Sequence, residues 1–457
     1  MRLEKLHIEN YRCLRDMTVE LHPEITVLTA PNGAGKTTVL DAVRVALWPF
    51  VKGFDLGNKN GKAAGIYPAD VRLASQADGN MEPQLPSTVN ITGHWAPDQP
   101  PVVWQQARKS IKASTKTLGD ASARQLTAYA EKLQKQVRDG SPQVTLPLIS
   151  YLGTSRLWFE GRFTSKAEDT TLDTEDYSRT SGYLNCLSYS SSFKAFTAWY
   201  GWVYRAYFES QIDAIERGAK LDETGLRFAQ TIEVIKAAVD ALVKDATGWH
   251  SLEYSQRYNQ QLVMQHDQHG VMAVDMLSDG LRNAIAMVAD LAFRAFKLNP
   301  HLGVKAALLT PGVALIDEVD MFLHPSWQQT ILKSLQTAFP NLQFIVSTHS
   351  PQVLTTVASE SIRILRDGKV FSAPAGTEGA EPGRLLTTTL GLESVRPPDN
   401  EATKELLAYL KLVDEDKYGS PEALVLRKIL DARYEGNEPA LLEADLLIEN
   451  RQWEKGE

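Results

Sequence analysis

Residues 30–38 of this chain read Ala-Pro-Asn-Gly-Ala-Gly-Lys-Thr-Thr. Gly33 and Gly35 let the backbone bend so that its N–H groups converge on an anion. Lys36 adds a positive charge for the β- and γ-phosphates of a nucleotide, and Thr37 offers a hydroxyl to Mg²⁺. These residues predict a loop that cradles a nucleotide phosphate.

The sequence on either side of the loop predicts a strand before it and a helix after it. Residues 25–28 are a short β-branched run, and apolar residues recur at helical spacing over 39–47. The loop therefore ends at a helix N-terminus, where a phosphate is stabilised. Ala30 departs from the usual pattern, which begins with glycine, and it requires an ordinary φ. The candidate nucleotide contacts in the loop are Asn32, Gly33, Ala34, Gly35, Lys36, Thr37 and Thr38.

The composition of the chain is typical of a large globular protein. The chain has 457 residues, of which 43% are hydrophobic and 23% charged, and only two cysteines. No apolar run approaches the roughly 20 residues that span a bilayer, so we expect a cytoplasmic protein with no membrane partner. The net charge is −8, and residues 397–457 hold 15 acidic and 8 basic side chains. This acidic segment is either a solvated helical surface or a docking surface for a basic partner.

A second set of residues suited to nucleotide chemistry lies about 280 residues further on. Residues 313–317 read Val-Ala-Leu-Ile-Asp, which is typical of a buried parallel strand that ends in a carboxylate. Asp317 is then placed to reach the Mg²⁺ of a nucleotide held by the loop. The next residue, Glu318, is placed to polarise an attacking water. We therefore predict Thr37 and Asp317 as metal ligands and Glu318 as the general base.

Two further motifs add candidate contacts to the γ-phosphate. Residues 344–347 form another buried-strand run, and His349 follows at the edge of the sheet where ligands collect. Its imidazole is suited to bond the γ-phosphate and to position water. Residues 277–280 read Leu-Ser-Asp-Gly and precede an amphipathic helix. Ser278 and Gly280 there predict either a simple helix cap or a second anion site.

Patterning elsewhere predicts a mixture of strands and helices. The central region contains an aromatic-rich helix over 193–217 and an amphipathic helix over 224–244, which could pair as a hairpin. The aromatic stripe is read as packed core rather than a platform for stacked bases. The remaining expectations are strands at 3–9, 16–28, 87–95 and 144–151 (the last at a sheet edge because of its proline), a helix at 126–138, loops at 51–90 and 165–181, and a strand meander at 252–277.

The order of these motifs resembles the ABC-type ATPase head of RecF, SMC and OLD proteins. The opening Leu-His-Ile-Glu-Asn-Tyr-Arg-Cys-Leu is similar to their first strand, and Asp317-Glu318 with His324-Pro325 is similar to their Walker B and D-loop region. Within this group the chain most resembles stand-alone ATPases of anti-phage systems, such as PtuA of Septu and retron-associated ATPases. The resemblance covers residues 1–50 and 270–370 strongly.

The resemblance implies an α/β fold and a divided chain. We expect an ATPase head with a parallel sheet core, an antiparallel β part, a helical insertion and a helical C-terminal segment. The implied ranges are 1–100 for the first part of the head, 101–250 for the insertion, 251–395 for the second part of the head and 396–457 for the acidic C-terminal segment.

The resemblance also implies ATP and Mg²⁺ as cofactors and an assembly of two heads around two ATP molecules. In a homodimer or higher even oligomer, Ser278 and Gly280 of one copy would contact the γ-phosphate held by Lys36 of the other. Asp279 stands where transporter heads have glycine, and a carboxylate there is unfavourable unless it points away. Arg12 matches an arginine that approaches the nucleotide. Either Asp70 or Gln76 would be the residue that senses Mg²⁺.

No nuclease motif is visible in the sequence. Only 106 residues follow Pro351, and the acidic run at 414–416 lies in a helical context that indicates solvated charge. We therefore expect an ATPase whose nucleotide-dependent dimerisation controls a separate effector, such as an HNH nuclease, in anti-phage defence. The alternative is a DNA-repair clamp similar to RecF and SMC, which would bind nucleic acid in the dimer groove and would show salt-sensitive duplex binding.

Overall fold

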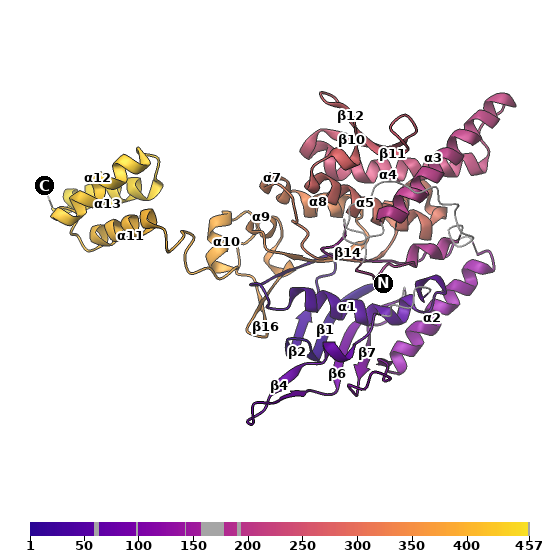
Figure 1. Cartoon of the computed structure of the whole chain (residues 1–457), viewed down its shortest axis with the longest axis horizontal. Coiled ribbons are helices and arrows are strands. Elements are labelled where there is room, and N and C mark those ends of the chain that lie inside the picture. The colour runs from indigo at the N-terminus through magenta and orange to yellow at the C-terminus, as the bar shows by residue number, and fades with distance from the viewer. Residues whose placement is uncertain (59–63, 97–98, 142, 157–177, 190–192, 456–457) are drawn as a thin grey trace. The chain divides into compact units, whose positions relative to one another are not determined.

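The computed structural model describes residues 1–457 except 59–63, 97–98, 142, 157–177, 190–192 and 456–457 (Figure 1). The chain divides into two compact units, Met1–Leu385 and Leu386–Glu457. Within the described residues, no helix has the length and apolar character needed to cross a membrane.

A six-stranded sheet forms the centre of the first unit. Its strand order is β16-β15-β3-β14-β13-β9, and all neighbours pair in parallel except β15 and β16. The central strands are buried on both faces, as their continuous apolar sequences predict. β9 lies at the edge, which confirms the prediction made from Pro147. The strands are β3 (Ile25–Thr29), β9 (Leu148–Leu152), β13 (Gly312–Ile316), β14 (Leu342–Thr348), β15 (Ile362–Arg366) and β16 (Lys369–Ser372).

A five-stranded antiparallel sheet makes a second layer, in the order β2-β1-β6-β7-β8. The strand predicted over 16–28 is in fact two strands, because the chain turns at His22-Pro23 and crosses from the antiparallel sheet to the parallel one. The range 101–250 contributes strands to both main sheets as well as helices. The strands of this layer are β1 (Arg2–Tyr11), β2 (Leu14–Glu20), β6 (Ser87–His94), β7 (Val102–Arg108) and β8 (Leu118–Gly119).

Helix α1 (Lys36–Val51) lies between the two sheets, as Figure 1 shows. It contacts β6 and β7 of one sheet and β14 of the other, so almost every side chain on it is buried. The buried positions are mostly apolar, and the charged residues Asp41 and Arg44 among them form an ion pair with each other. Helix α2 (Ala121–Arg138) packs against α1 and β7.

The other face of the parallel sheet carries a helical layer. α5 (Asp279–Leu298) contacts β9, and α4 (Glu223–Thr247) packs on α5. α3 (Phe193–Glu216) pairs with α4, which confirms the expected hairpin. The aromatic stripe of α3 is core from Phe193 to Tyr204. Shorter helices in this unit are α6 (Ala306–Leu309), α7 (Pro325–Gln328), α8 (Ile331–Ala338), α9 (Pro351–Leu354) and α10 (Pro382–Thr388), which extends into the second unit.

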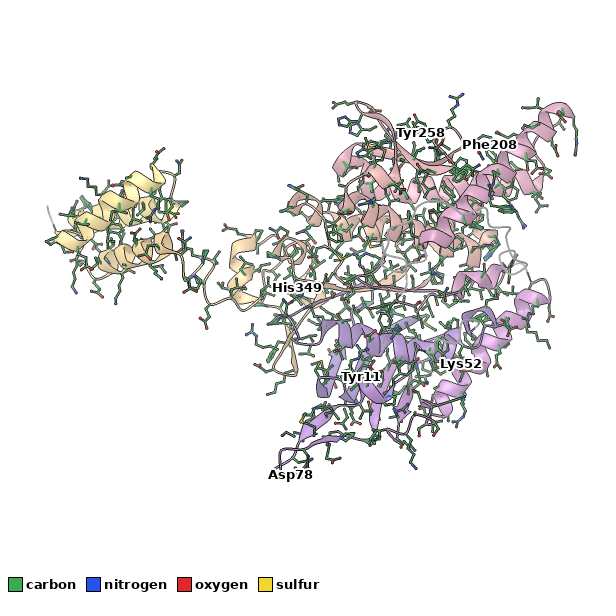
Figure 2. The ribbon with its side chains drawn as sticks, viewed as in Figure 1. Tyr11, Lys52, Asp78, Phe208, Tyr258 and His349 are labelled. Carbon is green, nitrogen blue, oxygen red and sulfur yellow. The ribbon has the colours of Figure 1, made fainter. Side chains whose placement is uncertain are left out.

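Two small hairpin structures complete the first unit. The predicted meander is present as β10 (Trp249–Ser255), β11 (Gln261–His266) and β12 (Gly270–Ala273), paired antiparallel. The region 51–90, expected to be a loop, contains the hairpin of β4 (Leu73–Ser75) and β5 (Met81–Pro83), with Asp78 at its tip (Figure 2). Most of the loop expected over 165–181 lies outside the described residues.

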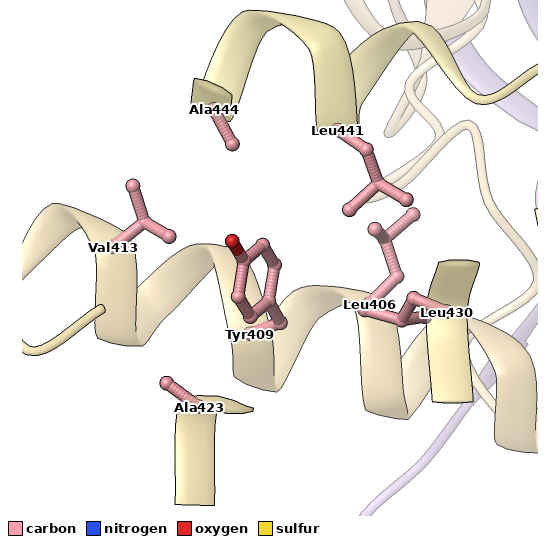
Figure 3. Close-up of a cluster of buried hydrophobic side chains, with 7 residues drawn as sticks. All are labelled: Leu406, Tyr409, Val413, Ala423, Leu430, Leu441 and Ala444. Carbon is pink, nitrogen blue, oxygen red and sulfur yellow. The ribbon is translucent and has the colours of Figure 1, made fainter. Parts of the chain in front are cut away.

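Beyond the end of α10, the described residues of the second unit form three helices, α11 (Glu401–Asp414), α12 (Pro421–Tyr434) and α13 (Pro439–Lys455). They enclose a small core, drawn in Figure 3, in which Tyr409 is the largest side chain. The acidic run at 414–416 is exposed, as the reading of solvated charge predicts. The core residues are Leu406, Tyr409, Val413, Ala423, Leu430, Leu441 and Ala444.

Candidate nucleotide site

The loop between β3 and α1 has the backbone conformation that its glycines predict. Gly33 and Gly35 have φ values of 78° and 105°, and Gly35 is the N-cap of α1. Ala30 is not among the residues with positive φ, so alanine is accommodated there without strain. Lys36 Nζ donates to the carbonyl oxygen of Ala30 at 3.2 Å, which folds the lysine over the loop. The loop therefore presents backbone N–H groups and an ammonium group at a helix N-terminus.

The remaining loop candidates differ in exposure. Asn32, Gly33 and Thr37 are exposed, whereas Thr38 is buried. The backbone N–H of Ala34 donates to the carbonyl of Pro31 at 3.3 Å, which closes the turn. Exposed groups at the start of a buried helix are accessible to a ligand, so the loop is open where phosphate binding requires it.

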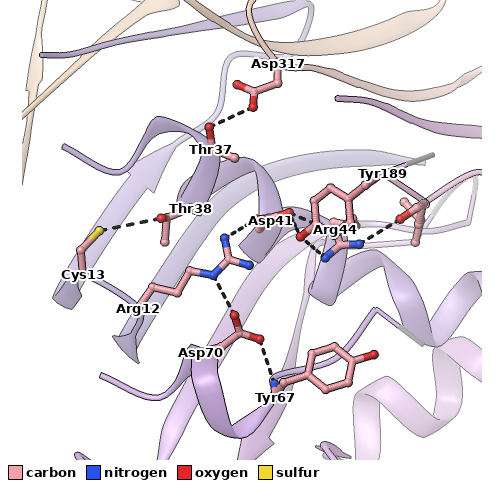
Figure 4. Close-up of polar contacts among 11 residues, drawn as sticks. Arg12, Cys13, Thr37, Thr38, Asp41, Arg44, Tyr67, Asp70, Tyr189 and Asp317 are labelled. Carbon is pink, nitrogen blue, oxygen red and sulfur yellow. Dashed lines mark hydrogen bonds and ion pairs between the residues drawn. The ribbon is translucent and has the colours of Figure 1, made fainter. Parts of the chain in front are cut away.

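The order of the parallel strands brings the second set of motifs to this loop. β3, β14 and β13 are neighbours, so their carboxyl ends meet at one edge. Asp317 follows β13 and His349 follows β14 (Figure 2 labels His349). Thr37 Oγ1 donates to Asp317 Oδ2 at 2.9 Å, a contact between residues 280 positions apart (Figure 4).

A metal ion fits these two side chains. Mg²⁺ prefers oxygen ligands and is usually held by one or two protein groups together with substrate phosphates. The hydroxyl of Thr37 and the carboxylate of Asp317 already lie side by side. Among the described residues, no group of three or more His, Cys, Asp or Glu is arranged to hold a metal by itself. The site is therefore suited to a cation that arrives with phosphate.

Ser347, the next-to-last residue of β14, connects the two acidic candidates. Its Oγ donates to Asp317 Oδ1 at 2.5 Å and accepts from the backbone N–H of Glu318 at 2.8 Å. Ser347 is fully buried, so both bonds are shielded from water. The sequence analysis treated this serine only as part of a strand; its polarity within an apolar run was the available signal.

Glu318 adopts a left-handed backbone with φ of 48°. This conformation is uncommon for residues other than glycine and is found where surrounding contacts hold it. Its side chain is half-buried, whereas Asp317 is buried. The two adjacent carboxylates therefore have different environments, and only that of Glu318 is partly open to water.

The charges at this edge influence one another. Burial lowers the pKa of Lys36, and the carboxylates of Asp317, Glu318 and Asp320 oppose this shift. Burial and then the charge of Lys36 lower the pKa of His349 below 6.5, so the neutral form of its imidazole predominates at pH 7. Asp320, which the sequence analysis did not select, accepts a hydrogen bond from Thr348 Oγ1 at 2.6 Å.

Arg12, which was predicted to approach the nucleotide, forms ion pairs with two carboxylates, one of them on α1. Its Nε donates to Asp70 Oδ1 at 2.8 Å, and Nη1 forms an ion pair with Asp41 (Figure 4). Asp70, a candidate Mg²⁺ sensor, is therefore a partner of Arg12, while Gln76 is exposed in the β4–β5 hairpin. The buried Asp41 also accepts from Tyr189 Oη at 2.7 Å. The roles predicted for Arg12, Asp70 and Gln76 stay predictions.

The Ser-Asp-Gly turn caps α5. Ser278 Oγ accepts from the backbone N–H of Leu281 at 3.4 Å, and Asp279 forms an ion pair with Arg282. Ser278 and Asp279 are exposed, whereas a Cβ added to Gly280 would lie 2.3 Å from the carbonyl oxygen of Phe322. No hydrogen bond among the described residues joins this turn to the phosphate loop of the same chain.

Two family models match this chain over overlapping ranges. A family model described as "AAA domain" matches residues 5–235, half of the chain. The chain belongs to this AAA-domain family. A second model, described as "AAA domain, putative AbiEii toxin, Type IV TA system", matches residues 140–355. Membership makes this AAA-domain protein a nucleotide-binding ATPase, which confirms the ABC-type ATPase reading of its motifs.

Relatives of this AAA-domain protein include proteins of retron and Septu systems. The Retron Ec83 probable ATPase of Escherichia coli is 26% identical, over 99% of this chain and 88% of the relative. The Retron Vc95 probable ATPase of Vibrio cholerae is 54% identical over 20% of this chain and 17% of the relative. The Septu protein PtuA of Bacillus mycoides is 32% identical over 27% of this chain and 18% of the relative.

Proposed function

We propose that this ATPase binds Mg²⁺–ATP at the edge where β3, β13 and β14 end, with Lys36 at the β- and γ-phosphates. Thr37 and Asp317 hold the metal, which when bound neutralises charge on the phosphates. Glu318 accepts a proton from the attacking water, and neutral His349 orients the γ-phosphate. The contact of 2.9 Å between Thr37 and Asp317 carries the proposal, because it unites the two motifs.

We further propose that two copies of the chain enclose the nucleotide, as a homodimer or a higher even oligomer. The exposed start of α5 is a helix N-terminus, which attracts the γ-phosphate held by Lys36 of a second copy. Asp279 would repel that phosphate if its charge were free. Its ion pair with Arg282 offsets the repulsion and supports Ser278 and Gly280 as contacts across the dimer.

We propose that the assembly controls a separate effector, such as an HNH nuclease, in anti-phage defence. The support is similarity to the Retron Ec83 probable ATPase over almost the whole chain, and to the Septu protein PtuA over part of it. The acidic unit Leu386–Glu457 is a suitable docking surface for a basic effector, since it carries most of the net negative charge.

The variant Glu318→Gln tests the catalytic proposal. Loss of the base should lower kcat for ATP hydrolysis by about 10²–10⁴-fold and should leave ATP binding intact. ATP-bound dimers should then accumulate and be visible by size-exclusion chromatography with light scattering. The exposed Glu82→Gln in the β4–β5 hairpin is the matched control. Turnover by Glu318→Gln at the rate of that control would refute the assignment of the base.

Two further measurements test the assembly and its role. Lys36→Ala should abolish ATP binding and any defence phenotype, and a fully active variant would refute the nucleotide site. Co-purification with the products of neighbouring genes should recover a stoichiometric effector. Duplex DNA binding that weakens steeply with salt would instead favour the DNA-repair clamp.

A further inference from the structure

Arg156 lies in the turn that follows the edge strand β9 and is almost completely buried, with 4% of its surface exposed. Burying a guanidinium group is unfavourable unless its donors are paired. Burial lowers the pKa of Arg156 to about 10, so the group stays charged at neutral pH. Such a residue requires a structural or functional reason.

The guanidinium of Arg156 holds both peptide groups of Glu318. Nη1 donates to the carbonyl oxygen of Asp317 at 2.7 Å, and Nη2 donates to that of Glu318 at 2.8 Å. These carbonyls lie immediately before and after the α-carbon of Glu318, whose φ is 48°. Because the guanidinium is planar and rigid, the two bonds together restrict the left-handed backbone from which the Glu318 side chain projects.

The third side of the guanidinium reaches α5. Arg156 Nε donates to Asn283 Oδ1 at 2.6 Å, and Asn283 Nδ2 donates to the carbonyl oxygen of Met321 at 2.9 Å. Asn283 is fully buried. It lies about one helical turn after Gly280, which itself packs against the backbone of Phe322. The start of α5 and the segment 317–322 are thus joined at three points.

We propose that Arg156 is a positioning residue that couples the start of α5 to the orientation of Glu318. The inference rests on the proposed function, in which Ser278 and Gly280 contact a γ-phosphate and Glu318 is the base. When a second copy contacts the turn at the start of α5, that contact fixes the orientation of the Glu318 carboxylate through Asn283 and Arg156. ATP hydrolysis depends in this way on correct assembly.

The variant Arg156→Lys tests the coupling in the full chain. Lysine keeps the positive charge but cannot donate to both carbonyls and to Asn283 in one plane. Because a misplacement of about 1 Å costs roughly 10²-fold, we expect kcat for ATP hydrolysis to fall about 10- to 100-fold. KM should stay within about threefold, since the phosphate loop is untouched.

Arg294→Lys is the matched control. Arg294 is also a buried arginine that donates to backbone carbonyls, those of Gly182 and Leu184, and pairs with Asp290. Both variants should melt at a lower temperature, but only Arg156→Lys should lose kcat. Equal kcat in the two variants would mean that Arg156 is merely structural and would overturn the inference.

A second variant, Asn283→Ala, removes the α5 end of the link and leaves Arg156 in place. If both residues act through one link, the double variant should lose no more kcat than the more impaired single variant. A double variant whose fold-loss of kcat equals the product of the two single losses would overturn the coupling. If Arg156→Lys does not fold, wild-type kcat in folded Asn283→Ala refutes the inference and a selective loss of kcat supports it.

Glu318→Gln distinguishes a failure of the proposed function from a failure of the coupling through Arg156. Wild-type turnover by Glu318→Gln would refute the proposed function itself. An inactive Glu318→Gln beside a fully active Arg156→Lys would leave the proposed function standing and refute only the coupling.

Discussion

Ser347→Ala perturbs the site without changing any of the residues proposed to contact the nucleotide or the metal. The hydroxyl makes two buried bonds, one to the Asp317 carboxylate at 2.5 Å and one from the Glu318 backbone at 2.8 Å. Removing it leaves the N–H of Glu318 without its acceptor and the carboxylate without one donor. A buried unsatisfied donor costs about 1–3 kcal/mol and a bond to a charged group contributes about 1.5–3 kcal/mol. Together these two effects predict a loss of about 2.5–6 kcal/mol in the free energy of unfolding.

This loss converts into two measurable quantities. For the unit Met1–Leu385, the unfolding entropy is roughly 0.8 kcal/mol per kelvin, so the melting temperature should fall about 3–8 °C. If the displaced acidic pair raises the activation free energy of hydrolysis by about 1.4 kcal/mol, kcat for ATP hydrolysis falls about tenfold. Differential scanning calorimetry and a coupled phosphate-release assay measure the two effects.

Ser150→Ala is the control, because Ser150 is a buried serine of the same sheet that donates to Asp290 Oδ2 at 3.2 Å. It loses one longer bond and should cost about 1–2 kcal/mol in stability. Its kcat should stay within about twofold of wild type. If Ser347→Ala retains wild-type kcat, or loses no more than Ser150→Ala, then Ser347 does not position the acidic pair and the reasoning fails.

Three further outcomes are expected. Gly35 has a φ of 105°, and an added Cβ would lie 3.2 Å from Leu14. Gly35→Ala should therefore weaken ATP binding at least tenfold, as measured by equilibrium dialysis. Gly79→Ala in the β4–β5 turn, also at positive φ, should not weaken ATP binding. Because the pKa of His349 is lowered, the acid limb of the kcat/KM profile should have its midpoint below pH 6.5, and an unchanged acid limb in His349→Gln would contradict this assignment. Leu406→Ala should destabilise the second unit by about 2–5 kcal/mol, as measured by circular dichroism melting. ATP turnover should stay unaltered. A loss of ATP turnover that accompanies the loss of stability would show that the two units are not independent.

The phosphate loop and the strand ends could be predicted because their signals are local. Glycines at 33 and 35 meet a backbone requirement of the loop itself, and an apolar run that ends in Asp317 indicates a buried parallel strand without knowledge of its neighbours. His349 was found in the same way. The edge position of β9 followed from a single proline.

The residues that hold these groups in place could not be predicted in the same way. Ser347 and Asn283 lie inside apolar patterns and are polar for reasons found on other elements. Arg156 is 161 positions from the carbonyl of Asp317 that it binds. The pairing of Arg12 with Asp41 and Asp70 depends on how α1 packs against the β1–β2 turn.

Residues close together in the chain were sufficient to predict the ligand class and the type of sheet. Phosphate binding depends on a few residues that are adjacent in the chain, and the alternation of strand and helix around them is a local property. The tertiary structure decided which carboxylate lies beside Thr37, that Asp279 is neutralised by Arg282, and that the start of α5 is connected to Glu318 through Arg156. These relations join residues distant in sequence, so they exist only when the strands have their final order and the side chains are buried together.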